Sequence, residues 1–156
     1  MTIMNEKMSN LITVSPVLTV HATYAANDYV GTNSVAMIFA NAARFTGGTG
    51  YVLGCELTDY AKQSVNGELW LFDTAITPPL DSAAWTISDA HAATCIGIIP
   101  FDTWYLSAVN GISNGVPAYP LHFAATARAL YGCFVTRGAP AYASLDLTFR
   151  LAVMQD

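Results

Sequence analysis

The stretch at residues 145–153, LDLTFRLAV, decides the fold class of this chain. Apolar and polar side chains alternate along it with a period of two residues. The apolar set, expected to face inward, is Leu145, Leu147, Phe149, Leu151 and Val153. Such alternation is typical of a β-strand that has one face in the core and the other in solvent. We therefore expect a half-buried strand to close the chain.

Similar patterns recur upstream, separated by residues that favour turns. The strands that we predict lie at residues 11–14, 17–24, 34–40, 51–59, 68–73, 94–101, 104–106, 121–127, 129–136 and 145–153. Within 51–59, Leu53, Cys55 and Leu57 are expected to face one way. The 68–73 stretch is apolar on both faces, which indicates a central strand that is covered on both sides.

The remaining segments are predicted to be irregular. Pro78 and Pro79 exclude residues 74–82 from an inner strand, because proline cannot donate to a strand ladder. Residues 82–93 form the only helical candidate, and Ser88 is expected to cap a turn there. Residues 110–120, which are rich in Asn, Gly and Pro, are predicted to form a long loop.

Many short strands without alternating helices predict an all-β fold, an antiparallel β-sandwich. A jelly-roll-like sandwich would suit the length and the strand count, although other sandwich topologies stay open. We expect a single domain at residues 16–156, preceded by an N-terminal arm at residues 1–15. The arm has no evident partner in its own domain, so a neighbouring subunit is expected to hold it in place.

Charge is unusually sparse for a chain without a membrane segment. Only 11% of the 156 residues are Asp, Glu, Lys or Arg, against about 25% in a typical soluble domain. We infer that copies of the chain, or a larger assembly, cover much of its surface. The net charge of −5, with six scattered cations, disfavours direct contact with nucleic acid.

No segment predicts a membrane anchor or a secretory signal. No apolar run reaches the roughly 18 residues that are required to span a bilayer. The N-terminal sequence MTIMNEKMSN also lacks the basic start and apolar middle of a signal peptide. We therefore expect the protein to be made in a cytoplasm.

No residue pattern predicts catalysis, a metal site or a cofactor. Residues 111–115, GISNG, match the GxSxG motif of serine hydrolases, but no strand–helix unit surrounds Ser113, so a plain turn is expected. Cys55, Cys95 and Cys133 are isolated in apolar stretches and are expected to be buried free thiols. Carboxylates such as Glu56 with Asp59, or Glu68 with Asp73, are expected to be solvated or bonded to turns.

Several stretches resemble a family of small proteins encoded among the structural genes of tailed bacteriophages. The resemblance covers residues 16–156. It is carried by GGTGYV at 47–52, ELTDYAKQ at 56–63, LWLFDT at 69–74, ISDAHAATCIGIIPF at 87–101, LYGCFVTRGAPAYAS at 130–144 and LDLTFRLAVMQD at 145–156. The chain is similar to head-decoration, or cement, proteins.

This resemblance implies a β-sandwich that binds the outside of a capsid as a virion structural protein. Its partners would be the major capsid protein and two further copies of itself in a homotrimer at local threefold positions. The family implies no enzymatic residues and no cofactor. The residues that we predict at its interfaces are Ile3, Met4, Leu11, Trp85, Trp104, Tyr105 and Tyr119.

Two other functions stay open at this point. The chain would also suit a tail, neck or fibre component of a virion, although fibres usually contain repeats or coiled coils. The second alternative is a carbohydrate-binding module, because tryptophan and tyrosine rings stack on sugars.

Overall fold

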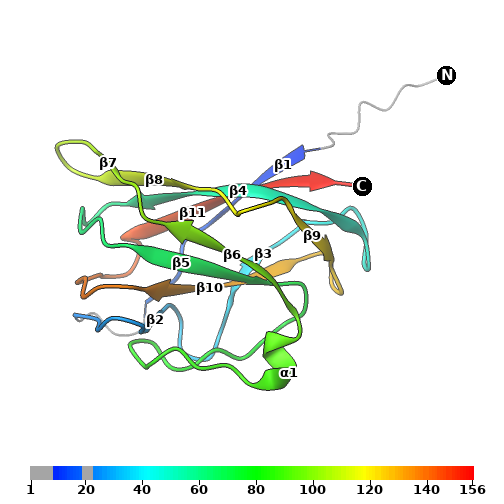
Figure 1. Cartoon of the computed structure of the whole chain (residues 1–156), viewed down its shortest axis with the longest axis horizontal. Helices are drawn as coiled ribbons and strands as arrows, with labels where there is room; N and C mark the ends of the chain where they lie inside the picture. Colours follow the sequence, from blue (N-terminus) through cyan, green and yellow to red (C-terminus); the bar gives the residue numbers. More distant parts are fainter. Residues whose placement is uncertain (1–8, 19–22) are drawn as a thin grey trace.

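The computed structural model describes residues 9–18 and 23–156. Two antiparallel sheets pack face to face (Figure 1), so the predicted all-β antiparallel β-sandwich is confirmed. The first sheet has the order β1 (Ser9–Val14), β11 (Leu147–Gln155), β4 (Thr49–Asp59), β8 (Gly111–Gly115) and β7 (Tyr105–Leu106), with β9 (Leu121–Ala124) also on β4. The second has the order β2 (Tyr29–Val30), β10 (Leu130–Thr136), β5 (Gly67–Phe72) and β6 (Cys95–Phe101), with β3 (Met37–Phe39) on β10.

Strands that are distant in sequence pair in a nested order. β1 pairs with β11, β2 and β3 pair with β10, β4 pairs with β8 and β9, and β5 pairs with β6. Successive strands therefore cross repeatedly from one sheet to the other. Ser9 at the start of β1 lies opposite Met154 near the end of β11.

Phenylalanine rings fill the centre of the space between the sheets. Phe101, Phe134 and Phe149 come from three different strands, and each is fully buried. The ring of Phe149 lies 5.3 Å from that of Phe134 and 6.1 Å from that of Phe101. These tilted and edge-on contacts stabilise the core beyond the burial of apolar area.

The predicted inward face of the final strand is confirmed over β11. Leu147, Phe149, Leu151 and Val153 are buried, as the alternation requires. The strand begins two residues later than expected, and Leu145 is 64% exposed. Leu145 has a φ of 71°, which belongs to a turn conformation rather than to a strand.

The 68–73 stretch is covered on both faces, as predicted. In β5, Leu69 and Leu71 face the main core. Phe72 joins a second apolar cluster on the outer side of the same sheet, and Trp70 packs against that cluster. Ile76 and Trp85 from the following loop close over it. The chain thus covers the outer face of its own second sheet.

The predicted loop at 110–120 is wrong for its first half. Residues Gly111–Gly115 form β8, which lies between β4 and β7. The Asn and Gly residues suggested a turn, but these glycines allow a close approach. A Cβ atom on Gly115 would lie 2.5 Å from Ile99 Cγ2 and 2.9 Å from the Pro100 carbonyl oxygen.

We expect Gly115→Ala to lower the free energy of unfolding by about 1–3 kcal/mol, because the added methyl group overpacks the core. Urea denaturation followed by circular dichroism measures the effect. Asn114→Ala, at the exposed neighbouring position, should change stability by less than about 0.5 kcal/mol. A Gly115→Ala variant as stable as the parent would contradict the close packing.

A β-bulge changes the predicted alternation in β4. The register between β4 and β11 shifts between Ala152 and Val153, which leaves Leu53 without a directly opposite residue. Val52 and Cys55 both face the core, whereas Leu53 is 43% exposed. The expectation that Leu53 faces the same way as Cys55 and Leu57 is therefore wrong, because a bulge adds one residue to one strand only.

The expectation that the arm lacks a partner in its own domain is wrong for residues 9–14. These residues form β1, which pairs with β11 in unbroken register. Ile12 and Val14 pack against the main core. Apolar residues at alternate positions therefore anchor this segment within the domain itself.

Two further predictions agree with the structure only in part. The predicted helix at 82–93 reduces to α1 (Asp89–Ala92), and the Ser88 Oγ accepts a hydrogen bond from the His91 amide as expected of a cap. In the predicted strand at 17–24, Thr23 forms a single bridge to Ala141, and residues 19–22 lie outside the described residues.

No helix in the described part of the chain is long and apolar enough to span a bilayer.

Candidate binding face

The outer face of the first sheet is not covered by the rest of the described chain. In Figure 1, α1 and the loops beside it lie below the second sheet, on the side away from β1, β4, β8 and β11. We call the outward-facing side of the first sheet the open face. An uncovered sheet face normally carries many polar and charged side chains, whereas this one carries polar residues with very few charges.

The strand registers define rows of side chains across the open face. From β1 toward β8 or β9, the four rows are Ser9–Met154–Tyr51–His122, Leu11–Ala152–Gly54, Thr13–Arg150–Glu56–Asn114 and Thr148–Thr58–Ile112, the last reaching Tyr105 on β7. Most of these residues are small, apolar or neutral. The face therefore offers area for contact with little charge to desolvate.

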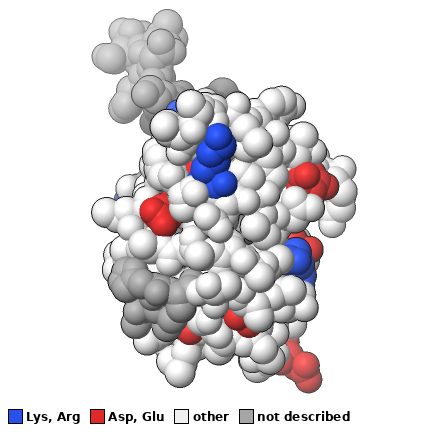
Figure 2. All heavy atoms as spheres, turned by 90° about the vertical axis from the view of Figure 1, so that its left-hand side faces the viewer, with Lys and Arg blue, Asp and Glu red and all other residues white. Residues whose placement is uncertain are grey.

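Arg150 and Glu56 are the charged residues in these rows, and they form one ion pair. The guanidinium group of Arg150 lies 3.3 Å from the carboxylate of Glu56, and the two side chains come from adjacent strands. Their charges cancel, so the open face is neutral overall. Figure 2 shows a different side of the molecule, where blue and red atoms are also sparse among white ones.

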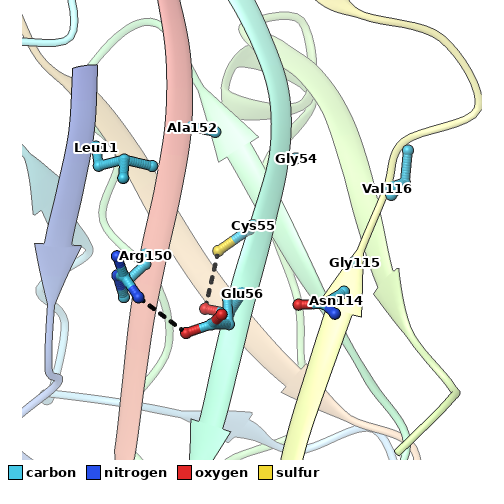
Figure 3. A pocket seen from close by; sticks show the side chains of 9 residues that line it. All are labelled: Leu11, Gly54, Cys55, Glu56, Asn114, Gly115, Val116, Arg150 and Ala152. Carbon is cyan, nitrogen blue, oxygen red and sulfur yellow. Dashed lines mark hydrogen bonds and ion pairs between the residues drawn. The ribbon is translucent and has the colours of Figure 1, made fainter. Parts of the chain in front are cut away.

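Small residues produce a shallow hollow in the middle of the open face. Gly54 and Ala152 lie at its floor, between Leu11 on β1 and Val116 after β8 (Figure 3). The hollow has a volume of about 340 Å³. A neighbouring hollow of about 610 Å³ extends along Leu11 and Leu53. Glu56, Asn114 and Arg150 also line the first hollow, so apolar side chains of a partner would fit beside Leu11 and Val116.

Three of the predicted interface residues are exposed in the structure. Leu11, Tyr105 and Tyr119 are 60%, 63% and 68% exposed. Leu11 borders the hollow and Tyr105 lies at the far edge of the same sheet, whereas Tyr119 lies in the loop before β9. Ile3 and Met4 lie outside the described residues.

The two predicted interface tryptophans are half-buried within the domain. The ring of Trp85 lies 5.5 Å from that of Trp70 and 6.0 Å from that of Tyr29, over the second sheet. Trp104 packs against the main core. Both side chains therefore pack within the domain, the ordinary alternative to an interface role for a tryptophan.

The serine and cysteine candidates are held inside the fold. The Ser113 hydroxyl is 1% exposed and donates to the Thr103 carbonyl oxygen at 2.7 Å. It lies in a strand, so the expected turn at this motif is wrong. All three cysteines are free thiols; Cys55 and Cys133 are buried, whereas Cys95 is half-buried. Burial raises the pKa of each thiol, which favours its protonated form.

The acid pairs that the sequence suggested do not converge. Glu56 faces outward to Arg150, whereas Asp59 on the same strand is fully buried. Glu68 accepts from the Trp70 indole and pairs with Arg137. In the described ranges, no three His, Cys, Asp or Glu side chains gather in a way that could hold a metal ion.

The buried Asp59 organises the turn that follows β4, in agreement with the expectation that this carboxylate is solvated or bonded to a turn. Its Oδ2 accepts from the Ser64 amide at 2.7 Å and from the Tyr142 hydroxyl at 3.4 Å. Burial raises the pKa of Asp59, although backbone amides of residues 61–64 act in the opposite direction. The carboxylate thus fixes a loop at one end of the sandwich, away from the hollows.

The raised pKa of Asp59 predicts a pH-dependent stability. A carboxyl whose pKa is higher in the folded state stabilises the fold fully below its ordinary value of 3.8, and this contribution is lost as the pH rises through the folded pKa. Asparagine cannot ionise. We therefore expect the free energy of unfolding of the wild type, minus that of Asp59→Asn, to fall as the pH rises above the ordinary value of 3.8. Urea titrations at several pH values measure it, and a difference that rose with pH would refute the assignment.

Comparison with family models, with curated proteins and with solved structures finds no match to this chain. The functional argument therefore depends on the open face and on the sequence resemblance described above.

Proposed function

We propose that this protein is a virion structural protein that decorates a bacteriophage capsid. The observation that carries the proposal is the open face, a neutral sheet surface whose small residues form hollows bordered by Leu11, Leu53 and Val116. Such a face suits permanent contact with another protein, because few charges must be desolvated when it is covered. The resemblance to head-decoration proteins supplies the kind of partner.

In this proposal the open face lies against the major capsid protein on the exterior of the shell. Contacts repeated by the symmetry of the capsid would add up to a large stabilisation from a modest area per copy. The resemblance extends the proposal to a homotrimer at local threefold positions. Such a protein would act as cement between neighbouring coat subunits, with no chemical reaction.

We also propose that the sandwich is a jelly roll. Nested pairing of the first strand with the last, the second with the next to last and so on inward is how a jelly roll is wound. Jelly rolls are common in viral capsid proteins and in lectins. The topology is thus compatible with the virion proposal and with the carbohydrate alternative.

The side chains favour the virion proposal over a carbohydrate-binding module. A sugar platform built on tryptophan requires an accessible indole ring, but Trp70, Trp85 and Trp104 are all half-buried in packing contacts. The exposed rings of Tyr105 and Tyr119 lie on separate segments, β7 and the loop before β9. A role in the tail, neck or fibre would use the same open face with a different virion protein. Binding partners therefore distinguish these possibilities.

Co-sedimentation with capsids tests the proposal. Purified protein is mixed with empty capsids that were assembled from the major capsid protein of the same virus without this chain. Saturable co-sedimentation, with added resistance of the capsids to heat, is the expected result. Protein that stays in the supernatant with capsids but sediments with isolated tails would support the tail alternative. Binding to a glycan array alone would overturn the virion proposal.

A further inference from the structure

The outer edge of β1 is the longest unprotected strand edge among the described residues. β1 ends the first sheet, where it pairs only with β11, and it lies close to β3 of the second sheet without pairing with it. Its six residues, SNLITV, contain no charge and no proline, and the register has no bulge. Natural proteins usually protect such an edge, because its free backbone groups pair readily with another strand.

The other sheet edges are shorter or interrupted, and the edge strands β3 and β9 contain three and four residues. β7 and β2 contain two residues each, which is too short for a stable pairing. β6 is longer, but Pro100 interrupts its hydrogen-bond donors and its register shifts near Cys95. The contrast indicates that the edge of β1 is kept available for pairing.

We propose that β1 pairs antiparallel with β1 of a second copy across a twofold axis, so that the two first sheets become one continuous sheet. A strand without charge is compatible with its own copy, because no like charges meet. A twofold axis perpendicular to the sheet keeps outward residues outward. Leu11 can then lie opposite Leu11 of the second copy, with Ser9 opposite Thr13.

This register gives the exposed Leu11 a partner. The side chain is 60% exposed in the single chain and borders both hollows of the open face. Opposite its own copy it forms an apolar cross-strand pair. The Leu11–Ala152–Gly54 rows of the two copies then join end to end, which makes the open face continuous across the pair.

The pairing is independent of capsid binding and is a separate contact from the threefold contact of the proposed homotrimer, because a twofold contact joins copies only in pairs. It is tested on the full chain in solution. In a Cys95→Ser background, Leu11→Cys places two thiols opposite each other. Directly opposite residues have Cα atoms about 4.5–5.5 Å apart, within the range of a disulfide. Thr13→Cys is the matched control, because Thr13 is also exposed on β1 but would lie roughly 14 Å from its own copy.

After mild oxidation, we expect Leu11→Cys to form a covalent dimer on a non-reducing gel, reversed by dithiothreitol, and Thr13→Cys to stay uncrosslinked. Light scattering should show that Leu11→Lys halves the mass of the wild-type particle, because two added ammonium groups would meet at the axis. Equal crosslinking of both cysteine variants, or none of either, would overturn the pairing. A wild-type mass that Leu11→Lys leaves unchanged would overturn it as well.

Discussion

Phe149→Ala is expected to lower the free energy of unfolding by about 3–5 kcal/mol, because it removes a fully buried ring from the centre of the core. The ring touches Phe101 and Phe134, which belong to two strands of the opposite sheet. These neighbours cannot collapse into the gap without moving the sheets, so a cavity would remain. A loss of this size approaches the whole stability of many domains.

Equilibrium denaturation in urea, followed by tryptophan fluorescence, measures this loss. Phe45→Ala is the matched control, because Phe45 is 61% exposed and loses the same atoms. It should change stability by less than about 0.5 kcal/mol. Similar losses in the two variants would show that the three rings do not form the centre of the core.

The double variant Leu53→Lys with Val116→Lys is expected to weaken capsid binding at least about 100-fold. Both residues border hollows of the open face and are 43% and 65% exposed, so the free protein should tolerate the change. In the bound state each ammonium group would lose water at an interface with few charges, at a cost of several kcal/mol. About 1.4 kcal/mol corresponds to a tenfold change in affinity.

Ile38→Lys with Leu80→Lys provides the matched control for this measurement. These residues are 52% and 58% exposed, and neither lies on the first sheet. Quantitative co-sedimentation should show wild-type affinity for the control and a loss for the open-face variant, with equal stability in urea. Equal affinity of the two variants would exclude the open face as the capsid contact.

Much of the sandwich could be predicted from the sequence where a local residue pattern alone determines the structure of a segment. Alternation in β11 identified its buried face, and the doubly apolar β5 identified a strand covered on both sides. The proline pair after β5 correctly marked a segment outside the sheets. In each case burial outweighs other preferences, so a local pattern is sufficient.

The segments that were predicted wrongly depend instead on contacts between residues that are distant in sequence. The inward position of Val52 depends on a bulge against β11, and the strand at 111–115 depends on packing against Ile99 and Pro100. Both contacts join segments that are far apart in sequence. Glycine and asparagine favour turns locally, but tertiary packing overrode that preference here.

The candidate binding face was the least predictable feature. Leu11 was selected from the sequence, but the sequence did not indicate that Gly54 and Ala152 would lie beside it in one row. That row exists only once the register of three strands is fixed. A sequence signal was present in the sparse charge, which indicated covered surface without indicating where.

The position of Ser9 opposite Met154 has a practical consequence for joining the chain end to end. The first and last strands of the described domain are neighbours, so a short linker would span the distance between them. Closing the backbone into a ring would reduce the entropy of the unfolded chain with little strain on the folded one. The same proximity makes new termini in the exposed turn at 107–110 a suitable choice for a circularly permuted form.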